Sequence, residues 1–418
     1  MSRRAHIAMA SIPAPGHVNP SLEIIRELVA RGHRVSYIND PMSTEAVTAT
    51  GADLVPYSTR LPVGTGGSAW PEDRIGIADL FLDDAMAMLA AARPALDGDR
   101  PDLFLYDIAG AAARVLADNW DRPSLQLSPT YVAWQEYEQD MAAEVAAMKQ
   151  DPRGAEHYRR FAAWLADNGL AGTDPDRFMG RPEHALVLIP RALQPHADSV
   201  DPERYTFIGP CFGSRSEQGV WTRPDDAEKV LLVSLGSAFT DQPAFYRACS
   251  QAFGSLPGWH VVLQVGRYVD IAGLGEVPAN VEVHRWVAQL AVLEQCDAFV
   301  THAGMGGSTE GLYCGLPMIA VPQAVDQFGN ADALVDLGVG RRLDTEQATP
   351  EALRTALLEL TGDPEVARRS AAIRRELREE GGTARAADAA LTDRDVPGAR
   401  FQGVRRPAAR RRRMRTAR

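Results

Sequence analysis

The arrangement of apolar and turn residues near the start of the chain constrains its fold most strongly. Residues 7–12 form a short apolar run that is typical of a buried parallel strand, and residues 34–38 predict a second strand. Between them, apolar residues recur at helical spacing, from a predicted N-cap at Asn19 with Pro20 in the first helical position to an end at Gly32. A strand, a helix and a strand within about 30 residues predict a βαβ unit with a right-handed crossover.

The same alternation of strands and helices continues along the chain in two series. In the first series we expect strands at 103–107, 124–127, 185–189 and 205–209, and helices over 109–117 and 132–170. In the second series we expect strands at 230–235, 259–265, 298–301 and 318–321, and helices over 328–337, 351–360 and 364–380.

A polar segment separates the two series and sets the expected domain boundaries. We predict an α/β fold of two doubly wound, Rossmann-like domains over residues 1–212 and 227–375, joined by a linker over 213–226. Residues 376–395 are expected to form a helix that crosses back to the first domain, and residues 396–418 to form a disordered, Arg-rich tail. Ligands of such sheets bind outside the carboxyl ends of the strands, which places the expected site in the cleft between the domains.

The distribution of charge and of cysteine argues against several classes of protein. The net charge is −11 although nine Arg and no acid follow from Arg400 onward, so the body of the chain is acidic and would repel a nucleic-acid backbone. No run of 18 apolar residues predicts a membrane span. The four cysteines lack the spacing of metal ligands, and no P-loop or nucleophile elbow occurs. We expect a cytoplasmic protein with free thiols and without a cofactor, a metal or a specific nucleic-acid partner; no oligomeric state is predicted.

A glycine-rich turn follows the strand predicted at 298–301. Residues 302–310 (His-Ala-Gly-Met-Gly-Gly-Ser-Thr-Glu) open a helix and leave backbone N–H groups bare at its N-terminus, where the helix dipole favours an anion. His302 and Ser308 can add donors to phosphate oxygens, and Glu310 can accept hydrogen bonds from a ribose diol. The alternative is a tight turn that needs its glycines for geometry alone.

Two further sets of polar residues follow predicted strands. Asp326 and Gln327 lie on the loop after the last of these strands, where they can recognise sugar hydroxyls, although Asp326 could instead cap the next helix. His17, in an expected turn over 13–17, and Asp107 both lie at carboxyl ends of strands in the first half. Adjacent strands would bring them together as an imidazole base with a carboxylate behind it, and the alternative is that each caps a local element.

Four blocks of the sequence resemble one family of enzymes. They are residues 15–22 (Pro-Gly-His-Val-Asn-Pro-Ser-Leu), 235–239 (Leu-Gly-Ser-Ala-Phe), 284–290 (His-Arg-Trp-Val-Ala-Gln-Leu) and 302–330 (His-Ala-Gly-x-Gly-Gly to Pro-Gln-x-x-Asp-Gln-x-x-Asn). The chain resembles the inverting GT-B glycosyltransferases of glycosyltransferase family 1, in the UDP-glycosyltransferase superfamily, and especially the bacterial enzymes that glucosylate macrolides. The resemblance implies GT-B architecture and the transfer of glucose from UDP-glucose to a hydroxyl of a macrolide antibiotic, which inactivates the antibiotic.

The resemblance also implies a role for each matched residue. His17 is the implied general base on the acceptor hydroxyl, and Asp107 is its partner. Trp286 is implied to stack on uracil, with Val287 and Gln289 flanking the base and the ribose. The other implied donor-binding residues hold the ribose, the diphosphate or the glucose: Glu310 for the ribose; Ser237, His302, Gly304, Gly307 and Ser308 for the diphosphate; Asp326 and Gln327 for the glucose.

Aromatic and Met side chains in the first half are the expected apolar wall for the acceptor, and any one of them could instead belong to the core. They are Trp70, Phe81, Met86, Met88, Tyr131, Trp134, Tyr137, Met141 and Met148. Ala288 stands where the family usually has Pro, which makes the uracil-side loop less rigid. Three alternatives stay open: a different hydrophobic acceptor such as a flavonoid or a TDP-sugar donor, a non-catalytic sugar-nucleotide binding protein, and a nicotinamide oxidoreductase, which the broken glycine fingerprint disfavours.

Overall fold

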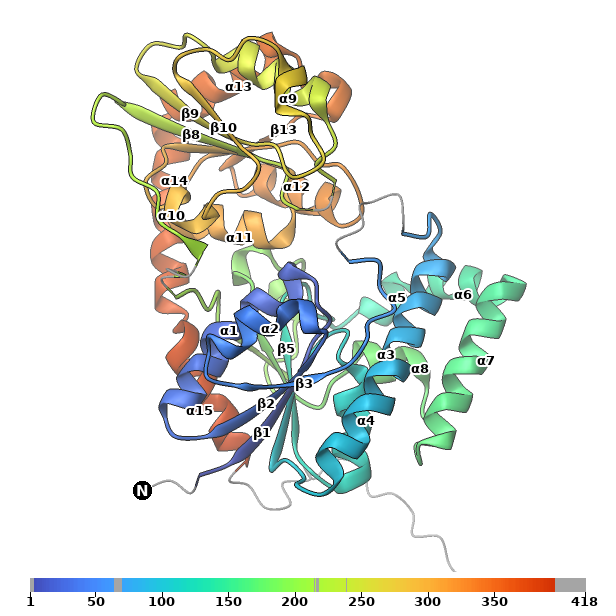
Figure 1. Cartoon of the computed structure of the whole chain (residues 1–418). Coiled ribbons are helices and arrows are strands. Elements are labelled where there is room, and N and C mark those ends of the chain that lie inside the picture. The colour runs from blue at the N-terminus through green and yellow to red at the C-terminus, as the bar shows by residue number, and fades with distance from the viewer. Residues whose placement is uncertain (1–3, 64–69, 214, 216–217, 238, 395–418) are drawn as a thin grey trace, which may run out of the picture.

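The computed structural model describes residues 4–63, 70–213, 215, 218–237 and 239–394. These residues form two α/β domains, one above the other in Figure 1. The first domain contains a seven-stranded parallel sheet of order β3-β2-β1-β4-β5-β6-β7. Its strands are β1 (His6–Ala10), β2 (Arg34–Asn39), β3 (Asp53–Pro56), β4 (Leu103–Asp107), β5 (Ser124–Ser128), β6 (Ala185–Val187) and β7 (Tyr205–Phe207).

The second domain contains a six-stranded parallel sheet of order β10-β9-β8-β11-β12-β13. Its strands are β8 (Lys229–Ser234), β9 (Trp259–Gln264), β10 (Val281–His284), β11 (Ala298–Thr301), β12 (Met318–Ala320) and β13 (Gly340–Arg342). Both strand orders are those of doubly wound sheets, so the fold class predicted from the sequence is confirmed.

Helices cover both sheets. Those of the first domain are α1 (Pro15–Ala30), α2 (Thr44–Thr48), α3 (Arg74–Asp97), α4 (Ala111–Trp120), α5 (Tyr137–Asp140), α6 (Ala142–Gln150), α7 (Pro152–Asp167) and α8 (Pro175–Gly180). Those that follow are α9 (Pro243–Phe253), α10 (Gln289–Leu293), α11 (Met305–Cys314), α12 (Gln327–Asp336), α13 (Pro350–Gly362), α14 (Pro364–Glu379) and α15 (Gly382–Arg394).

The central strands of the first sheet, β1 and β4, are buried on both faces, as their continuous apolar runs predict. Alternate side chains enter two different cores. Ala8 and Phe104 pack against α3 and α4, whereas Ile7 and Leu105 pack against α1. This period of two is the ordinary consequence of strand geometry, and it anchors the ends of β1 and β4 on which the candidate site is built.

The last helix returns to the first domain, where α15 lies beside α1 (Figure 1). Ala387 of α15 is fully buried in the same core as α1, and Arg31 Nη1 of the segment after α1 donates to Asp388 Oδ1 at 2.5 Å. The predicted crossing helix began at 376, but residues 376–379 still belong to α14. Gly381 and Gly382 both have positive φ (105° and 51°), a conformation that ends one helix before the next begins. The tail expected over 396–418 lies outside the described residues.

Helix α1 begins earlier than the sequence predicted. Its N-cap is Ala14 rather than Asn19, Pro15 lies at the helix start, and Pro20 lies inside the helix. The expected turn at 13–17 is therefore wrong from Pro15 onward, and His17 lies in the first helical turn. Pro15 permits this start because its missing N–H and fixed φ cost nothing at the first helical position.

Other regions also differ from the predicted elements, and the strands β3, β10 and β13 were not predicted. The helix expected over 132–170 consists of α5, α6 and α7, because Asp151 caps a new helix at Pro152. Helix α3 was not predicted, although Leu82, Ala85 and Leu89 recur at helical spacing and are all buried. The signal was present, but it lies in a segment where nearly every position is apolar or Ala.

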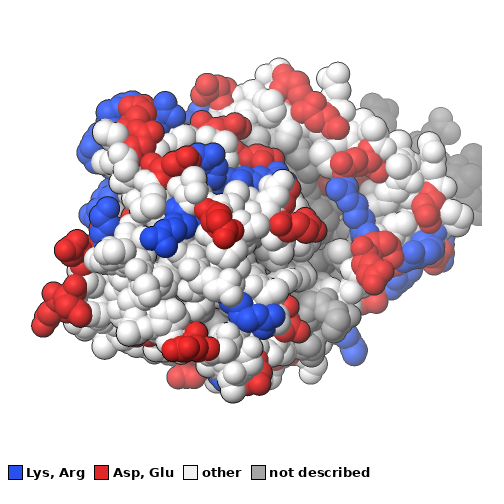
Figure 2. Space-filling view, turned by 90° about the horizontal axis from the view of Figure 1, so that it is seen from above, with Lys and Arg blue, Asp and Glu red and all other residues white. Residues whose placement is uncertain are grey.

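The surface carries both signs of charge. Figure 2, which views the molecule from above the second domain, shows Lys and Arg interspersed with Asp and Glu over this face. The four cysteines are free thiols, and Cys211, Cys249 and Cys314 are buried as expected, whereas Cys296 is only partly buried. Within the described ranges, every helix is too short or too polar to cross a bilayer.

Candidate active site

Each sheet contains a point where the chain changes the direction in which it adds strands. In the first sheet this point lies between the neighbours β1 and β4, and in the second it lies between β8 and β11. Ligands of doubly wound sheets bind outside the carboxyl ends of the strands at such points. Predicted site residues follow all four strands: His17 follows β1, Asp107 ends β4, Ser237 follows β8 and His302 follows β11.

His17 and Asp107 form a hydrogen-bonded pair at the first of these points. His17 Nδ1 donates to Asp107 Oδ2, and Asp107 Oδ1 accepts the N–H of Ala109 at 3.0 Å. Asp107 is only 1% exposed, whereas 24% of the His17 side chain is exposed. Because an ionised carboxylate can only accept, the neutral imidazole carries its proton on Nδ1, and Nε2 holds the lone pair of a base.

A glycine and a buried hydroxyl network support this pair from below. A Cβ at Gly110 would lie 2.6 Å from the carbonyl oxygen of Ala10, so glycine lets the turn after β4 pack against β1. The Tyr37 hydroxyl makes hydrogen bonds to Ser11 Oγ (2.9 Å) and to Ser21 Oγ on α1 (2.8 Å). These contacts hold the N-terminal half of α1 against the sheet and so orient the helix that carries the base.

The N-terminus of α11 is an uncapped set of backbone N–H groups. Its N-cap, Gly304, offers no side chain, Gly306 has open space beside it, and Gly307 is buried. The buried hydroxyl of Ser308 has no hydrogen-bond partner within the described part of the chain. An unpartnered buried hydroxyl at a helix N-terminus suits the binding of an anion.

The ring of His302 lies between the backbones of Gly236 and Gly304. A Cβ at either glycine would collide with this ring. Ala303 links the ring to the helix with a positive φ of 58°, which is uncommon for a residue with a side chain. Desolvation lowers the pKa of His302 to about 4, so the imidazole is neutral at pH 7 and can donate one hydrogen bond to a phosphate oxygen. Ser237, next to Gly236, is exposed on the same loop.

The loop after β10 presents a flat aromatic surface close to this turn. Trp286 is 59% exposed, a high value for an indole. The N–H of Val287 donates to Gln264 Oε1 (3.1 Å), and Gln264 Nε2 donates to Ser234 Oγ (3.1 Å) and to the carbonyl oxygen of Gly236 (3.2 Å). Gln264 thereby ties the Trp286 loop to the end of β8. An exposed aromatic face beside an anion site suits the stacking of a nucleobase.

The carboxylate of Glu310 already has two partners in the second domain and the linker. Arg215 Nη1 donates to Oε1 at 2.6 Å, and Gln289 Nε2 donates to Oε2 at 2.7 Å. The side chains of Arg215 and Glu310 are only 10% and 8% exposed. Both oxygens that the resemblance assigns to a ribose therefore already accept one hydrogen bond each, and a diol that binds Glu310 would share the carboxylate with Arg215 and Gln289.

Asp326 and Gln327 stand at the start of α12. Asp326 is at the N-cap position but makes no capping hydrogen bond; its Oδ2 instead accepts from Asn330 Nδ2 at 2.9 Å. The alternative of a simple helix cap is therefore wrong. Gln327 Oε1 accepts the N–H groups of Gln323 (2.8 Å) and Ala324 (3.1 Å), which closes the loop. The amide nitrogen of Gln327 is thus the end that can donate to a sugar hydroxyl.

One of the side chains expected to line the acceptor pocket is instead buried in the core. Met88 is fully buried between α3 and the first sheet and belongs to the core. The other eight residues of the predicted wall are half-buried. Trp134 and Tyr137 pack edge to face at 5.0 Å between ring centroids, at the start of the helical block α5–α8 on one side of the first domain (Figure 1).

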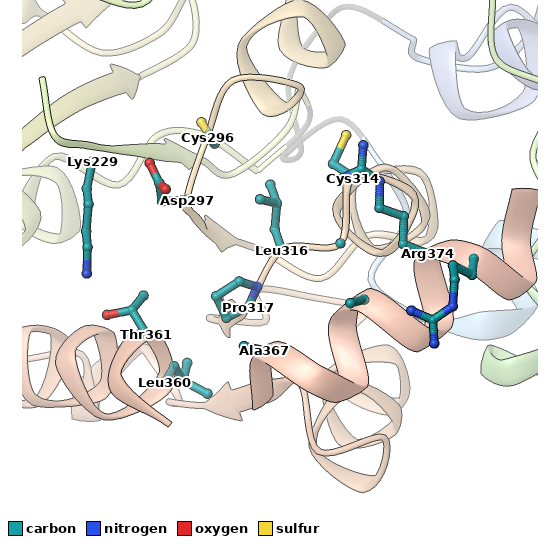
Figure 3. A pocket seen from close by; sticks show the side chains of 13 residues that line it. Lys229, Cys296, Asp297, Cys314, Leu316, Pro317, Leu360, Thr361, Ala367 and Arg374 are labelled. Carbon is teal, nitrogen blue, oxygen red and sulfur yellow. The ribbon is translucent and has the colours of Figure 1, made fainter. Parts of the chain in front are cut away.

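A separate cavity of about 560 Å³ lies at the opposite end of the second sheet. Lys229 at the start of β8, Asp297 before β11 and Pro317 before β12 line it, together with Thr361 of α13 and Arg374 of α14 (Figure 3). These are the amino ends of the strands. The cavity contains none of the predicted site residues, so the arrangement at the carboxyl ends does not depend on it.

The sequence analysis did not single out several residues that shape this site. Gln264 carried a weak signal, since it is a polar residue at the end of an apolar strand, and Asn330 carried a stronger one as the last residue of the motif at 302–330. Arg215 carried no signal, because one Arg in a polar linker is ordinary. Gly110 carried no signal either, because a side chain is excluded there only by the contact with Ala10 in the folded protein.

The arrangement can activate a hydroxyl group and stabilise a phosphate leaving group. Figure 1 shows α11 at the lower edge of the second domain, facing α1. A base with a free lone pair on one domain and an anion-binding helix N-terminus on the other are the two parts that a transfer from a phosphate ester requires. Within the described residues, His, Cys, Asp and Glu side chains form no group of three or more that could hold a metal ion.

Comparison with known protein families and sequences gives consistent results. The family described as erythromycin biosynthesis protein CIII-like, C-terminal domain, matches residues 261–386. Oleandomycin glycosyltransferase of Streptomyces antibioticus is 56% identical over 395 residues, which cover 94% of this chain and 91% of that protein. NDP-glycosyltransferase YjiC of Bacillus licheniformis is 31% identical and covers 92% of this chain and 96% of its own length.

Two solved structures share both the sequence and the architecture. The glycotransferase of kitacinnamycin is 57% identical with a TM-score of 0.88, and the match covers 95% of this chain and all of that one. The calicheamicin glycosyltransferase CalG4 is 32% identical with a TM-score of 0.82, and the match covers 94% of this chain and 98% of that one. At these identities and coverages the similarity extends over both domains.

Proposed function

This chain belongs to the GT-B glycosyltransferases of macrolides and other natural products, and on that premise we propose that it moves a glucosyl group from UDP-glucose to a hydroxyl of a macrolide. The observation that carries the proposal is the pairing of His17 with Asp107 on the domain that faces the uncapped N-terminus of α11. The 56% identity to an oleandomycin glycosyltransferase supports a macrolide acceptor. Trp286 beside the anion site supports a nucleotide-linked donor.

The proposed reaction is a single displacement with inversion. The acceptor O–H gives its proton to Nε2 of His17 while its oxygen attacks the anomeric carbon of the sugar, and the bond from that carbon to the diphosphate breaks. UDP leaves with the electron pair. The imidazolium formed is stabilised by the buried Asp107 carboxylate, and attack from the face opposite UDP converts an α-linked donor into a β-linked product.

The leaving diphosphate gains negative charge as the bond breaks. The bare N–H groups of α11, the hydroxyl of Ser308 and the neutral imidazole of His302 are donors placed where that charge develops. Asp326 and the amide nitrogen of Gln327 hold the glucose hydroxyls, and Trp286 stacks on the uracil. The scheme uses no metal ion.

Glucosylation of an antibiotic hydroxyl replaces a small polar group with a bulky one, and we propose that the product loses antibacterial activity. The proposed setting is the cytoplasm, in keeping with four cysteines that all remain free thiols. A second acceptor has support of its own, because the chain is 57% identical to a glycotransferase named for kitacinnamycin. Transfer to another hydrophobic natural product is therefore the competing proposal.

A donor and acceptor panel tests the proposal. Purified protein is incubated with UDP-glucose or TDP-glucose and with macrolides, flavonoids and other polyketides, and products are identified by mass spectrometry and by the anomeric coupling in NMR. We expect a hexose increment and a β linkage on a macrolide with UDP-glucose, and loss of growth inhibition by that product. Glycosylation only of the other acceptors, or only from TDP-glucose, would contradict the proposal.

A further inference from the structure

One hydrogen bond joins the two domains beside the loop that we assign to the donor sugar. The hydroxyl of Tyr131, three residues after β5 in the first domain, donates to Asn330 Oδ1 of α12 in the second domain at 2.7 Å. Tyr131 also packs against two hydrophobic clusters, one of the first domain that includes Val132 and one made mostly of second-domain residues, including Ala303. The contact is therefore part of a packed interface between the domains.

Asn330 is fully buried and uses all of its amide group. Its Nδ2 donates to Asp326 Oδ2 and to the carbonyl oxygen of Ala303, each at 2.9 Å, while its Oδ1 accepts from Tyr131. Turning the amide over would place its oxygen against a carboxylate and a carbonyl, both of which are acceptors, so one orientation satisfies every partner. Asn330 thus connects the glycine turn that precedes α11 to the carboxylate at the start of α12.

We propose that Tyr131 is a positioning residue for the donor sugar. Its hydroxyl holds the amide of Asn330, and Asn330 holds the carboxylate of Asp326, which is otherwise exposed on its loop. Because Tyr131 belongs to the acceptor domain, the geometry of sugar recognition in the second domain depends on a group supplied by the first. The inference rests on the proposed donor-sugar role of Asp326.

The physical reason is that the chain of hydrogen bonds is complete only with the Tyr131 hydroxyl in place. Without it, Asn330 Oδ1 is a buried acceptor that lacks a donor, an unfavourable state that the amide can relieve only by moving. Any such movement releases Asp326 Oδ2 or the carbonyl oxygen of Ala303. The sugar-binding carboxylate then has several orientations where the intact protein has one.

The substitution Tyr131→Phe removes this hydroxyl alone. We expect the Kd of UDP-glucose, measured by calorimetry, to rise about 2- to 10-fold, which corresponds to the net contribution of one hydrogen bond. The Kd of UDP should stay within a factor of two, because UDP carries no glucose for Asp326 to contact. The KM for UDP-glucose should rise with the Kd.

The matched control is Tyr158→Phe. The Tyr158 hydroxyl donates to Asp176 Oδ1 at the same 2.7 Å, but both residues lie on the outer helices α7 and α8 of the first domain. We expect this variant to bind UDP and UDP-glucose as the parent does. Thermal unfolding of all three proteins shows whether each is folded.

Three outcomes would contradict either the role of Tyr131 or the proposed function. An unchanged affinity of Tyr131→Phe for UDP-glucose overturns the inference, because the hydroxyl would then not position the sugar site. An equal loss of affinity for UDP and UDP-glucose also overturns it, since the contact would then govern the domain arrangement in general. If the unaltered protein binds neither UDP nor UDP-glucose, the proposed function fails instead.

Discussion

At the scale of single residues, the chemistry of this site depends on which atom of each side chain remains free. Because His17 Nδ1 donates to Asp107, Nε2 is left as the proposed base. The loop backbone donates to Gln327 Oε1 and leaves the amide nitrogen available to donate, whereas both oxygens of Glu310 already accept a hydrogen bond. The sequence predicted all of these residues as site residues from their type and place after strands. It could not predict the free atoms, because each depends on a partner that lies elsewhere in the chain.

The substitution His17→Ala tests the base. We expect kcat to fall by about 10²- to 10⁴-fold, the usual contribution of a general base, while the Kd of UDP stays unchanged because UDP binds to the other domain. His17→Gln is the sharper variant, since its amide can still donate to Asp107 but cannot take a proton. Near-parental turnover by His17→Gln would show that the imidazole only supports the structure.

His302 gives the stability of the protein a dependence on pH. Its pKa is about 4 in the folded chain and about 6.5 when unfolded, so the folded state disfavours the charged form. Stability is fully present above pH 6.5 and is lost as the pH falls toward 4, by up to about 1.4 kcal/mol per pH unit. We expect the urea midpoint of the parent to fall between pH 7 and pH 5 more steeply than that of His302→Gln. If the urea midpoints of the two proteins fell equally between pH 7 and pH 5, His302 would not be the source of the pH dependence.

At the scale of elements, helix and strand positions follow from local signals, and their exact starts follow from packing. The strands at 103–107 and 298–301 were predicted without error, because apolar runs bounded by turn residues have few alternatives. Helix α1 was misplaced because Pro15 and Pro20 both suit a first helical position. The earlier start matters for function, since it places His17 on a helix rather than on a turn.

The turn after β4 is an element whose tight packing we expect to matter for both stability and catalysis. The substitution Gly110→Ala places a Cβ 2.6 Å from the carbonyl oxygen of Ala10 and forces β1 and β4 apart where His17 and Asp107 meet. We expect a loss of about 1–3 kcal/mol in the free energy of unfolding, and a lower kcat. The measurements are urea denaturation and steady-state kinetics.

The matched control is Gly98→Ala at the end of α3, where φ is −74° and no atom lies within 4 Å of the added Cβ. This variant should be as stable and as active as the parent. Equal behaviour of the two alanine variants would show that the contact between Gly110 and Ala10 imposes no constraint.

At the scale of the whole molecule, several connections join the two domains. Tyr131 bonds to Asn330, Arg215 of the linker pairs with Glu310, and α15 returns from the second domain to pack on α1. The helix that carries His17 therefore rests on the last helix of the described chain. A helix that crosses back to the first domain was predicted from the sequence, but the buried residues that seal it are small and carry little hydrophobic signal.

A buried acid introduced between α15 and α1 tests whether the packing of α15 stabilises the first domain. The substitution Ala387→Asp buries an unpaired carboxylate against α1, and we expect a loss of about 3 kcal/mol or more in the free energy of unfolding. Ala384→Asp introduces the same group at an exposed position in the first turn of α15, where the helix dipole favours an acid. Thermal unfolding should separate the two variants, and similar melting temperatures would contradict the packing of α15 on α1.

By itself, the sequence determined the alternation of strands and helices, the division into two doubly wound domains, and the chemical types that follow the strands, because apolar periodicity, glycine and proline act over a few residues. Only the tertiary structure decided that Arg215 donates a hydrogen bond to Glu310 and that the Tyr131 hydroxyl donates one to Asn330. It also decided that a side chain at position 110 would collide with the backbone of Ala10. These contacts join residues as far as 199 positions apart. They are set by desolvation and by packing between surfaces that exist only after both domains have folded, so no local pattern can specify them.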